Sequence, residues 1–132
     1  MKLFICIDDE GGISFMGRRV SRDRTVTADI AALAGDNLTV FPYSERLFKE
    51  AGYPMRVMSG DIDDTAALFI EDRGGREFIE RADTVVLYRW NRLYPSDLKI
   101  DFSPCDEGFA LSETVDFVGK SHEKITREIY TK

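Results

Sequence analysis

The fold is decided by residues 66–90, which read AALFIEDRGGREFIERADTVVLYRW. Residues 66–71 (AALFIE), which are apolar up to Ile70, are typical of a short strand buried on both faces. A charged turn with two adjacent glycines follows, and REFIERA at 76–82 is long enough for one or two helical turns. TVVLYRW at 84–90 is rich in β-branched and aromatic residues and is the clearest strand of the chain. The stretch therefore predicts a strand, a short helix and a strand in succession, the unit from which parallel sheets are built.

The same alternation extends toward the N-terminus. Residues 2–7 (KLFICI) are nearly all apolar and predict a buried central strand. Ser21 is a candidate cap for a helix over about 22–34, which Gly35 would end. The other expected elements are a strand at 37–41, a helix that begins after Ser44 and ends at Gly52, and a strand at 55–58. Up to residue 90 the order is β-α-β-α-β-β-α-β, which predicts a largely parallel sheet with covering helices.

The last third of the chain has a different sequence pattern. A long polar loop at 93–108 contains two of the four prolines. Residues 108–117 and 122–131 then alternate in polarity and predict an antiparallel hairpin. Because no repeat or linker interrupts the sequence, we expect a single α/β domain over residues 1–132. Its expected fold is a mainly parallel sheet with flanking helices and a C-terminal antiparallel hairpin.

Composition limits the classes of function. The chain has 132 residues, of which 43% are hydrophobic and 32% charged, and its net charge is −6. The net negative charge argues against a general nucleic-acid binder, which needs a basic face. No apolar run reaches the roughly 18 residues that a membrane-spanning helix needs. The apolar stretch that follows Lys2 is too short for a signal peptide, which favours the cytoplasm.

Cysteine and histidine are scarce. The two cysteines are Cys6, expected to be buried in a strand, and Cys105, expected in a polar loop, and we expect both to be reduced thiols. His122 is the single histidine, and no CxxC spacing occurs, so a zinc site built from these residues is excluded and no metal is expected. His122 is predicted to be a surface or hairpin residue.

The loop after the first strand concentrates charge and backbone freedom. Residues 8–24 read DDEGGISFMGRRVSRDR, and Gly11 and Gly12 predict a turn that lets the backbone approach a ligand closely. Guanidinium groups beside a helix N-terminus suit phosphate or carboxylate. One interpretation is therefore a ligand-facing loop, and the other is a turn whose arginines are solvated or pair with acids of the same loop. The arginines are Arg18, Arg19, Arg22 and Arg24.

In the order of its segments the chain resembles dihydrofolate reductase. The matching segments are the first strand at 2–7, the glycine-containing loop, the first helix, the double-glycine unit at 66–90 and the closing hairpin at 108–131. The resemblance implies the fold of that family and a ligand pocket above the strands. It also implies that Asp23, near the start of the first helix, is a catalytic general acid or base.

Asp23 has two interpretations. A partly buried carboxylate near the carboxyl end of a central strand can have a raised pKa and move a proton near neutrality. Alternatively, an acid in the first turn of a helix is simply favoured by the helix dipole, and the flanking Arg22 and Arg24 hold it ionised.

The resemblance implies a pocket formed by residues 8–24, 42–46, 72–76 and 89–92. NADPH is the cofactor of that family, but its glycine-arginine-threonine signature is replaced here by PYSER at 42–46. Trp90 either stacks on a planar ring of a ligand or packs at the edge of the core. Candidate ligand-binding residues outside the first loop are Ser44, Arg46, Gly74, Gly75, Arg89 and Trp90.

The chain also resembles small proteins of Gram-positive bacteria that are sometimes labelled ribonuclease Z. The shared patterns are RRxSxDR, LYRWNRxYP and SHEKITRE. The label implies RNA processing, whereas the metal-dependent nuclease of that name holds its zinc ions with an HxHxDH cluster and further histidines. A single histidine cannot form that cluster.

These observations predict a small protein that binds a small anionic or heterocyclic ligand, such as a nucleotide, and they leave open whether it is an enzyme. Two alternatives remain. One is a non-catalytic protein-interaction module that uses the arginine-rich loop and Trp90, and the other is the RNA processing that the ribonuclease label implies.

Overall fold

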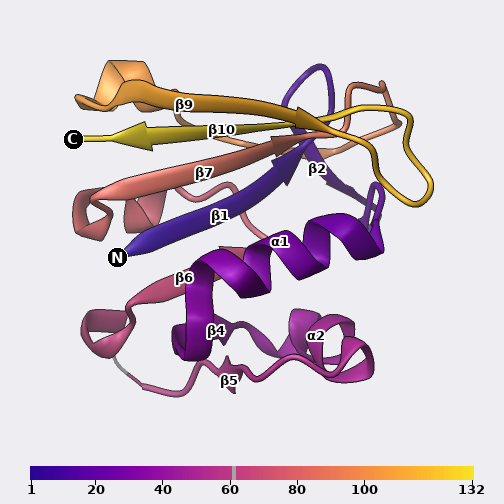
Figure 1. The fold of residues 1–132 in the computed structure, drawn as a ribbon. Coiled ribbons are helices and arrows are strands. Elements are labelled where there is room, and N and C mark those ends of the chain that lie inside the picture. The colour runs from indigo at the N-terminus through magenta and orange to yellow at the C-terminus, as the bar shows by residue number, and fades with distance from the viewer. Residues whose placement is uncertain (61) are drawn as a thin grey trace.

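The computed structural model describes residues 1–60 and 62–132, and within them the chain forms a seven-stranded sheet and a smaller three-stranded sheet (Figure 1). The large sheet has the order β5-β4-β6-β1-β7-β10-β9. The first five of these strands pair in parallel, and β10 runs antiparallel between β7 and β9. The predicted mainly parallel sheet with a C-terminal antiparallel hairpin is confirmed. The strands are β1 (Lys2–Ile7), β4 (Leu38–Val40), β5 (Arg56–Val57), β6 (Ala67–Ile70), β7 (Thr84–Arg89), β9 (Ala110–Phe117) and β10 (Ile125–Thr131).

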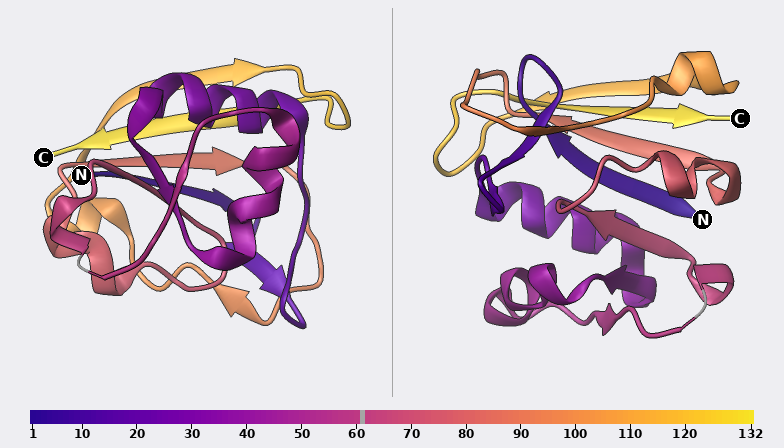
Figure 2. Two further views of the ribbon diagram at one scale, coloured as in Figure 1. Left: turned by 90° about the horizontal axis from the view of Figure 1, so that it is seen from below. Right: turned by 180° about the vertical axis from the view of Figure 1, so that it is seen from behind.

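The central strand β1 is apolar because both of its faces are buried. Alternate side chains point to opposite faces of a strand, so Leu3 and Ile5 lie in one core cluster and Phe4 in the other. The helices α1 (Arg24–Ala34) and α2 (Glu45–Ala51) cover the face of Phe4 (Figure 2). The 3₁₀ helix Arg76–Arg81 covers the other face. No helix among the described residues is long and apolar enough to cross a membrane.

Helix α1 begins two residues later than the sequence predicts. Asp23, and not Ser21, is its N-cap: Asp23 has extended backbone angles (φ −155°, ψ 132°), and its carboxylate accepts the N–H of Thr25. The prediction of Ser21 as the cap is therefore wrong, because the carboxylate of Asp23 takes that place directly before the helix. Ser21 is left in the connection to the helix, where its hydroxyl group meets other partners.

The small sheet was not predicted. It consists of β2 (Gly12–Phe15), flanked by β3 (Arg18–Arg19) and β8 (Leu98–Lys99). Strands of two to four residues are too short to show a period, so this sheet lies where a glycine turn and a polar loop were expected. Its consequence for the site is that β3 holds Arg19 next to the large sheet.

Gly12 allows the first loop to pack closely on itself. A β-carbon at this position would lie 2.6 Å from Ser96 Oγ and 2.7 Å from Asp8 Oδ2. The buried carboxylate of Asp8 accepts the N–H of Gly12 at 2.6 Å and the N–H of Tyr94 at 3.1 Å. These contacts explain why residue 12 is a glycine without requiring a bound ligand.

Candidate functional site

A buried ion pair lies at the carboxyl ends of β4 and β6. Glu71, which directly follows β6, has a side chain that is only 6% exposed. Its carboxylate accepts Arg19 Nε–H at 2.8 Å and Arg19 Nη2–H at 2.9 Å, and Ser44 Oγ donates to it at 2.6 Å. The hydrogen bonds that Arg19 donates to Glu71 raise the pKa of Arg19. The charge of Arg19 is thus already balanced inside the protein.

Arg19 and Glu71 also form part of the wall of a small cavity. Its volume is about 20 Å³, which is enough for about one water molecule. Cys6 of β1, Ile13 of β2 and Trp90 after β7 line the same space. The cavity therefore lies between the central strands and α1, where the sequence predicts a ligand pocket, but these side chains largely fill it.

Burial raises the pKa of the Cys6 thiol well above its ordinary value, and the nearby Glu71 carboxylate raises it further. Because the thiolate is the reactive form, we expect Cys6 to react with a disulfide reagent such as DTNB at least about 100-fold more slowly than the exposed Cys105. The release of chromophore at pH 8 by the wild type and by the Cys105→Ser variant measures the two rates. Equal rates for the two thiols would contradict the burial of Cys6.

An open cleft of about 450 Å³ adjoins this cavity. Both spaces are lined by Arg19, Arg22 and Leu47. The guanidinium of Arg22 is exposed and makes no ion pair or hydrogen bond with the described residues, while Arg46 approaches Glu50 at 3.7 Å. The cleft therefore presents an unbalanced positive charge at Arg22. Its complete lining is Arg19, Arg22, Pro42, Tyr43, Glu45, Arg46, Leu47 and Glu50.

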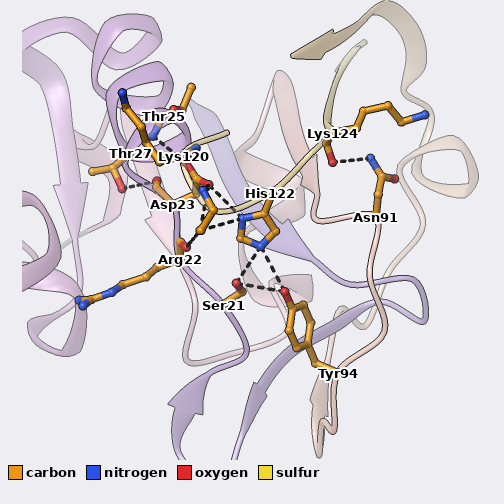
Figure 3. Close-up of polar contacts among 11 residues, drawn as sticks. Ser21, Arg22, Asp23, Thr25, Thr27, Asn91, Tyr94, Lys120, His122 and Lys124 are labelled. Atoms are coloured by element: carbon orange, nitrogen blue, oxygen red, sulfur yellow. Dashed lines mark hydrogen bonds and ion pairs between the residues drawn. The ribbon is translucent and has the colours of Figure 1, made fainter. Parts of the chain in front are cut away.

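Asp23 is the centre of a dense hydrogen-bond network (Figure 3). Its Oδ1 accepts the backbone N–H groups of Thr25 at 2.9 Å and Lys120 at 3.0 Å. Its Oδ2 accepts the Ser121 N–H at 2.9 Å, the Ser121 hydroxyl at 3.2 Å and the Nδ1 of His122 at 2.9 Å. The side chain is 0% exposed.

These contacts set the charge of Asp23. Burial alone would raise the pKa of its carboxyl group, but the hydrogen bonds, above all those from the two backbone N–H groups of the hairpin loop, hold the pKa well below its usual range. The raised pKa expected for a general acid is therefore not found. At neutral pH Asp23 is a fixed negative charge that accepts hydrogen bonds.

His122 lies in the connection between β9 and β10, as predicted, but the prediction of a surface residue is wrong. Its side chain is 2% exposed, and its ring stacks on Trp90 at a centroid distance of 4.7 Å. The ionised carboxylate of Asp23 can only accept a hydrogen bond from Nδ1 of His122. Nδ1 therefore carries the hydrogen of the neutral ring, and Nε2 is the acceptor. Nε2 lies 3.0 Å from Ser21 Oγ and 3.2 Å from the Tyr94 hydroxyl.

Not all predicted ligand residues come together. Arg19, Arg22 and Arg46 line the cleft, and Ser44 contacts its buried edge through Glu71. Arg18 lies in β3, and its side chain is exposed. Gly11 and Gly12 shape the turn that leads into β2 and do not line the cleft.

The double glycine also stands apart from the cleft. A β-carbon on Gly74 would lie 2.5 Å from the Asp101 carboxyl carbon, and Asp101 Oδ1 accepts the N–H of Arg76 at 2.8 Å. Gly75 has φ +100° and packs against Phe102. The protein's own Asp101 carboxylate therefore occupies the place where these backbone groups could hold an anion.

The two candidate residues at the end of β7 lie in different surroundings. Arg89 Nε donates to Glu128 at 2.7 Å across the pairing of β7 with β10, away from the cleft. Trp90 is buried in the helix-covered core and also lines the small cavity.

Sequence reasoning missed Glu71 and the partners of His122. An acid at the end of an apolar strand is a usable signal for Glu71, because ligands of open α/β sheets bind at that edge. Ser21 and Tyr94 carry no such signal, since their common partner, His122, is distant from both in the chain. Among the described residues, no group of three or more His, Cys, Asp or Glu side chains is placed to hold a metal ion.

No protein-family model matches the chain, and no curated protein matches it. Among solved structures, dihydrofolate reductase from Enterococcus faecalis, complexed with NADP(H) and RAB-propyl, matches with a TM-score of 0.72 and 12% identity. The match covers 98% of this chain and 94% of that chain. The chain therefore has a dihydrofolate reductase-like fold, as the resemblance implied. The resemblance to proteins labelled ribonuclease Z finds no support in these comparisons.

Proposed function

We propose that the chain binds a small anionic ligand, such as a nucleotide, in the cleft at Arg19, Arg22 and Arg46. The observation that carries the proposal is the unpaired guanidinium of Arg22 in a cleft of about 450 Å³. That volume falls within the range of roughly 300–1,000 Å³ of small-molecule sites. The cleft also borders the carboxyl edge of the parallel strands, where ligands of open α/β sheets bind. The cytoplasm is the location that we propose for this binding.

The ring of Tyr43 supports a ligand with a planar group. Tyr43 lines the cleft with a half-exposed side chain, and the Arg19 guanidinium lies 5.0 Å from the centre of its ring. A heterocycle can stack on such a ring while a phosphate group contacts Arg22.

NADPH is a more specific candidate for the ligand, because the structural neighbour is a complex with NADP(H). The residues present fit a dinucleotide poorly. Asp101 takes the backbone N–H of Arg76 beside the double glycine, and Ser44 is bound to Glu71. The acids Glu45 and Glu50 also line the cleft and oppose an extended polyanion. These features favour a compact anion with one or two phosphate groups.

Titration calorimetry with inorganic phosphate, AMP and NADPH tests the proposal. A charge-assisted hydrogen bond contributes about 1.5–3 kcal/mol, so Arg22→Ala is expected to weaken AMP binding by about 10- to 100-fold. Arg24→Ala is the matched control, because Arg24 is also exposed but does not line the cleft.

Equal affinities of the Arg22→Ala and Arg24→Ala variants for AMP would place the anion elsewhere. No heat of binding with any of the three probes at millimolar concentration would refute an anion site in this cleft. Tight binding of NADPH alone would replace the compact anion by a dinucleotide.

A further inference from the structure

Ser21, His122 and Asp23 form one continuous chain of hydrogen bonds (Figure 3). Ser21 Oγ lies 3.0 Å from His122 Nε2, and His122 Nδ1 lies 2.9 Å from Asp23 Oδ2. Both distances fall within the roughly 2.6–3.2 Å expected between a nucleophile, its base and the group that orients the base. The three residue types, in this connection, are those of a serine hydrolase triad, which is recognised by geometry and not by order in the chain.

The carboxylate has the properties that a triad requires. Asp23 is fully buried and accepts three backbone N–H groups in addition to the ring of His122. It therefore stays ionised, fixes the hydrogen of the ring on Nδ1 and leaves Nε2 as an acceptor that faces Ser21 Oγ and the Tyr94 hydroxyl. A proton that arrives at Nε2 is stabilised by the negative charge on the other side of the ring.

The ring of His122 is held in one orientation. Trp90 stacks on one face at 4.7 Å with an angle of 26° between the planes. The backbone O of His122 accepts the N–H of Gly119 at 2.9 Å, which closes the loop around Asp23. A β-carbon on Gly119 would collide with Asp23 Oδ2, so the loop lies directly on the carboxylate. A base that is fixed in this way is preorganised for proton transfer.

The nucleophile lies next to the buried base, on the wall of the small cavity. Ser21 is half-buried and lines the small cavity, together with Arg19 and Arg22, which also line the cleft. The Tyr94 hydroxyl donates to Ser21 Oγ at 3.3 Å. With that lone pair engaged, the Ser21 hydroxyl hydrogen is free to point to His122 Nε2.

We propose that Ser21, His122 and Asp23 are a catalytic triad that hydrolyses small carboxylic esters. Ser21 Oγ attacks the ester carbonyl carbon and forms a C–O bond while its proton passes to His122 Nε2. The bond to the alcohol oxygen then breaks, and the alcohol leaves with the proton from Nε2. Water attacks the acyl-Ser21 ester in the same way, which releases the carboxylic acid and restores Ser21. Ester and water thus give acid and alcohol.

This activity is independent of anion binding in the cleft, so a neutral probe tests it separately. Diisopropyl fluorophosphate forms an oxygen–phosphorus bond with an activated serine and releases fluoride. We expect intact-mass spectra of the full chain to show one adduct, which peptide mapping assigns to Ser21. Hydrolysis of p-nitrophenyl acetate is expected to decline in parallel with labelling.

The variants separate catalysis from a structural role. Ser21→Ala is expected to lose the adduct and at least about 100-fold of the esterase rate while it keeps its cooperative thermal transition. Ser112→Ala is the matched control, because Ser112 lies in β9 and its hydroxyl donates to the Ile129 carbonyl. It is expected to label like the wild type.

A second variant tests the triad even if Ser21→Ala loses stability. His122→Gln is expected to slow labelling of Ser21 at least about 100-fold at a temperature where circular dichroism shows it folded. Wild-type protein without an adduct, an adduct on another residue, or equal labelling of His122→Gln would each overturn the triad and leave a purely structural network.

Discussion

Replacement of Asp23 by alanine is expected to lower the free energy of unfolding by about 3–5 kcal/mol, the usual cost of removing one partner from a buried charged network. The substitution leaves the Lys120 and Ser121 backbone N–H groups and the ring of His122 without their acceptor. It also removes the N-cap of α1, which by itself contributes about 1 kcal/mol. Urea unfolding followed by circular dichroism measures the change.

Asp36→Ala is the control for this prediction, because Asp36 is exposed in the 3₁₀ turn after α1. It should change stability by no more than about 0.5 kcal/mol. An Asp23→Ala variant as stable as Asp36→Ala would mean that the network does not hold the hairpin loop in solution.

The same carboxylate sets the stability of the protein in acid. The pKa of Asp23 is lower in the folded chain than its ordinary value of 3.8. A group of this kind stabilises the fold above its unfolded pKa, and its contribution is lost as the pH falls through the range between the two values. We expect stability to decline steeply below about pH 4. Asp23→Asn should flatten this decline in a urea series from pH 7 to pH 2, and an unchanged acid limb would contradict it.

Replacement of Arg19 by methionine is expected to be the second large change, again by about 3–5 kcal/mol, because it leaves the buried Glu71 carboxylate with only Ser44 as a donor. The double variant Arg19→Met and Glu71→Met removes both charges and should recover most of the loss. A double-mutant cycle in urea measures the coupling between the two residues.

The pair Arg46 and Glu50 provides a matched comparison on the surface. Their atoms are 3.7 Å apart and both side chains are exposed, so Arg46→Met should cost less than about 1 kcal/mol. If Arg19→Met costs no more than Arg46→Met, then the ion pair does not close the cavity in solution.

The large sheet could be predicted from the sequence because its strands follow simple rules. Residues 3–7 and 85–88 are apolar throughout, since each strand is covered on both faces. The hairpin strands are more polar because β9 is mostly exposed on the edge of the sheet. Local patterns of this kind report burial, and burial is enough to fix the order of strands and helices.

The candidate site could be predicted only in part, because its contacts join distant segments. Asp23 and His122 are 99 positions apart, and Arg19 and Glu71 are 52 apart. The sequence predicted Ser21 as the helix cap and placed Asp23 within the first turn of the helix, whereas Asp23 is the N-cap. Only the position of the hairpin loop, brought over α1 by the sheet, assigns the cap to Asp23 and frees Ser21 for His122.

The insertion of β10 between β7 and β9 has a consequence for synthesis on the ribosome. A nascent chain of which only residues 1–90 have left the exit tunnel presents β7 with an unpaired outer edge, and the Asp23 carboxylate still lacks its donors at 120–122. Such an edge is prone to pair with other chains. Until residues 120–131 emerge from the exit tunnel, we therefore expect the growing polypeptide to be prone to aggregation.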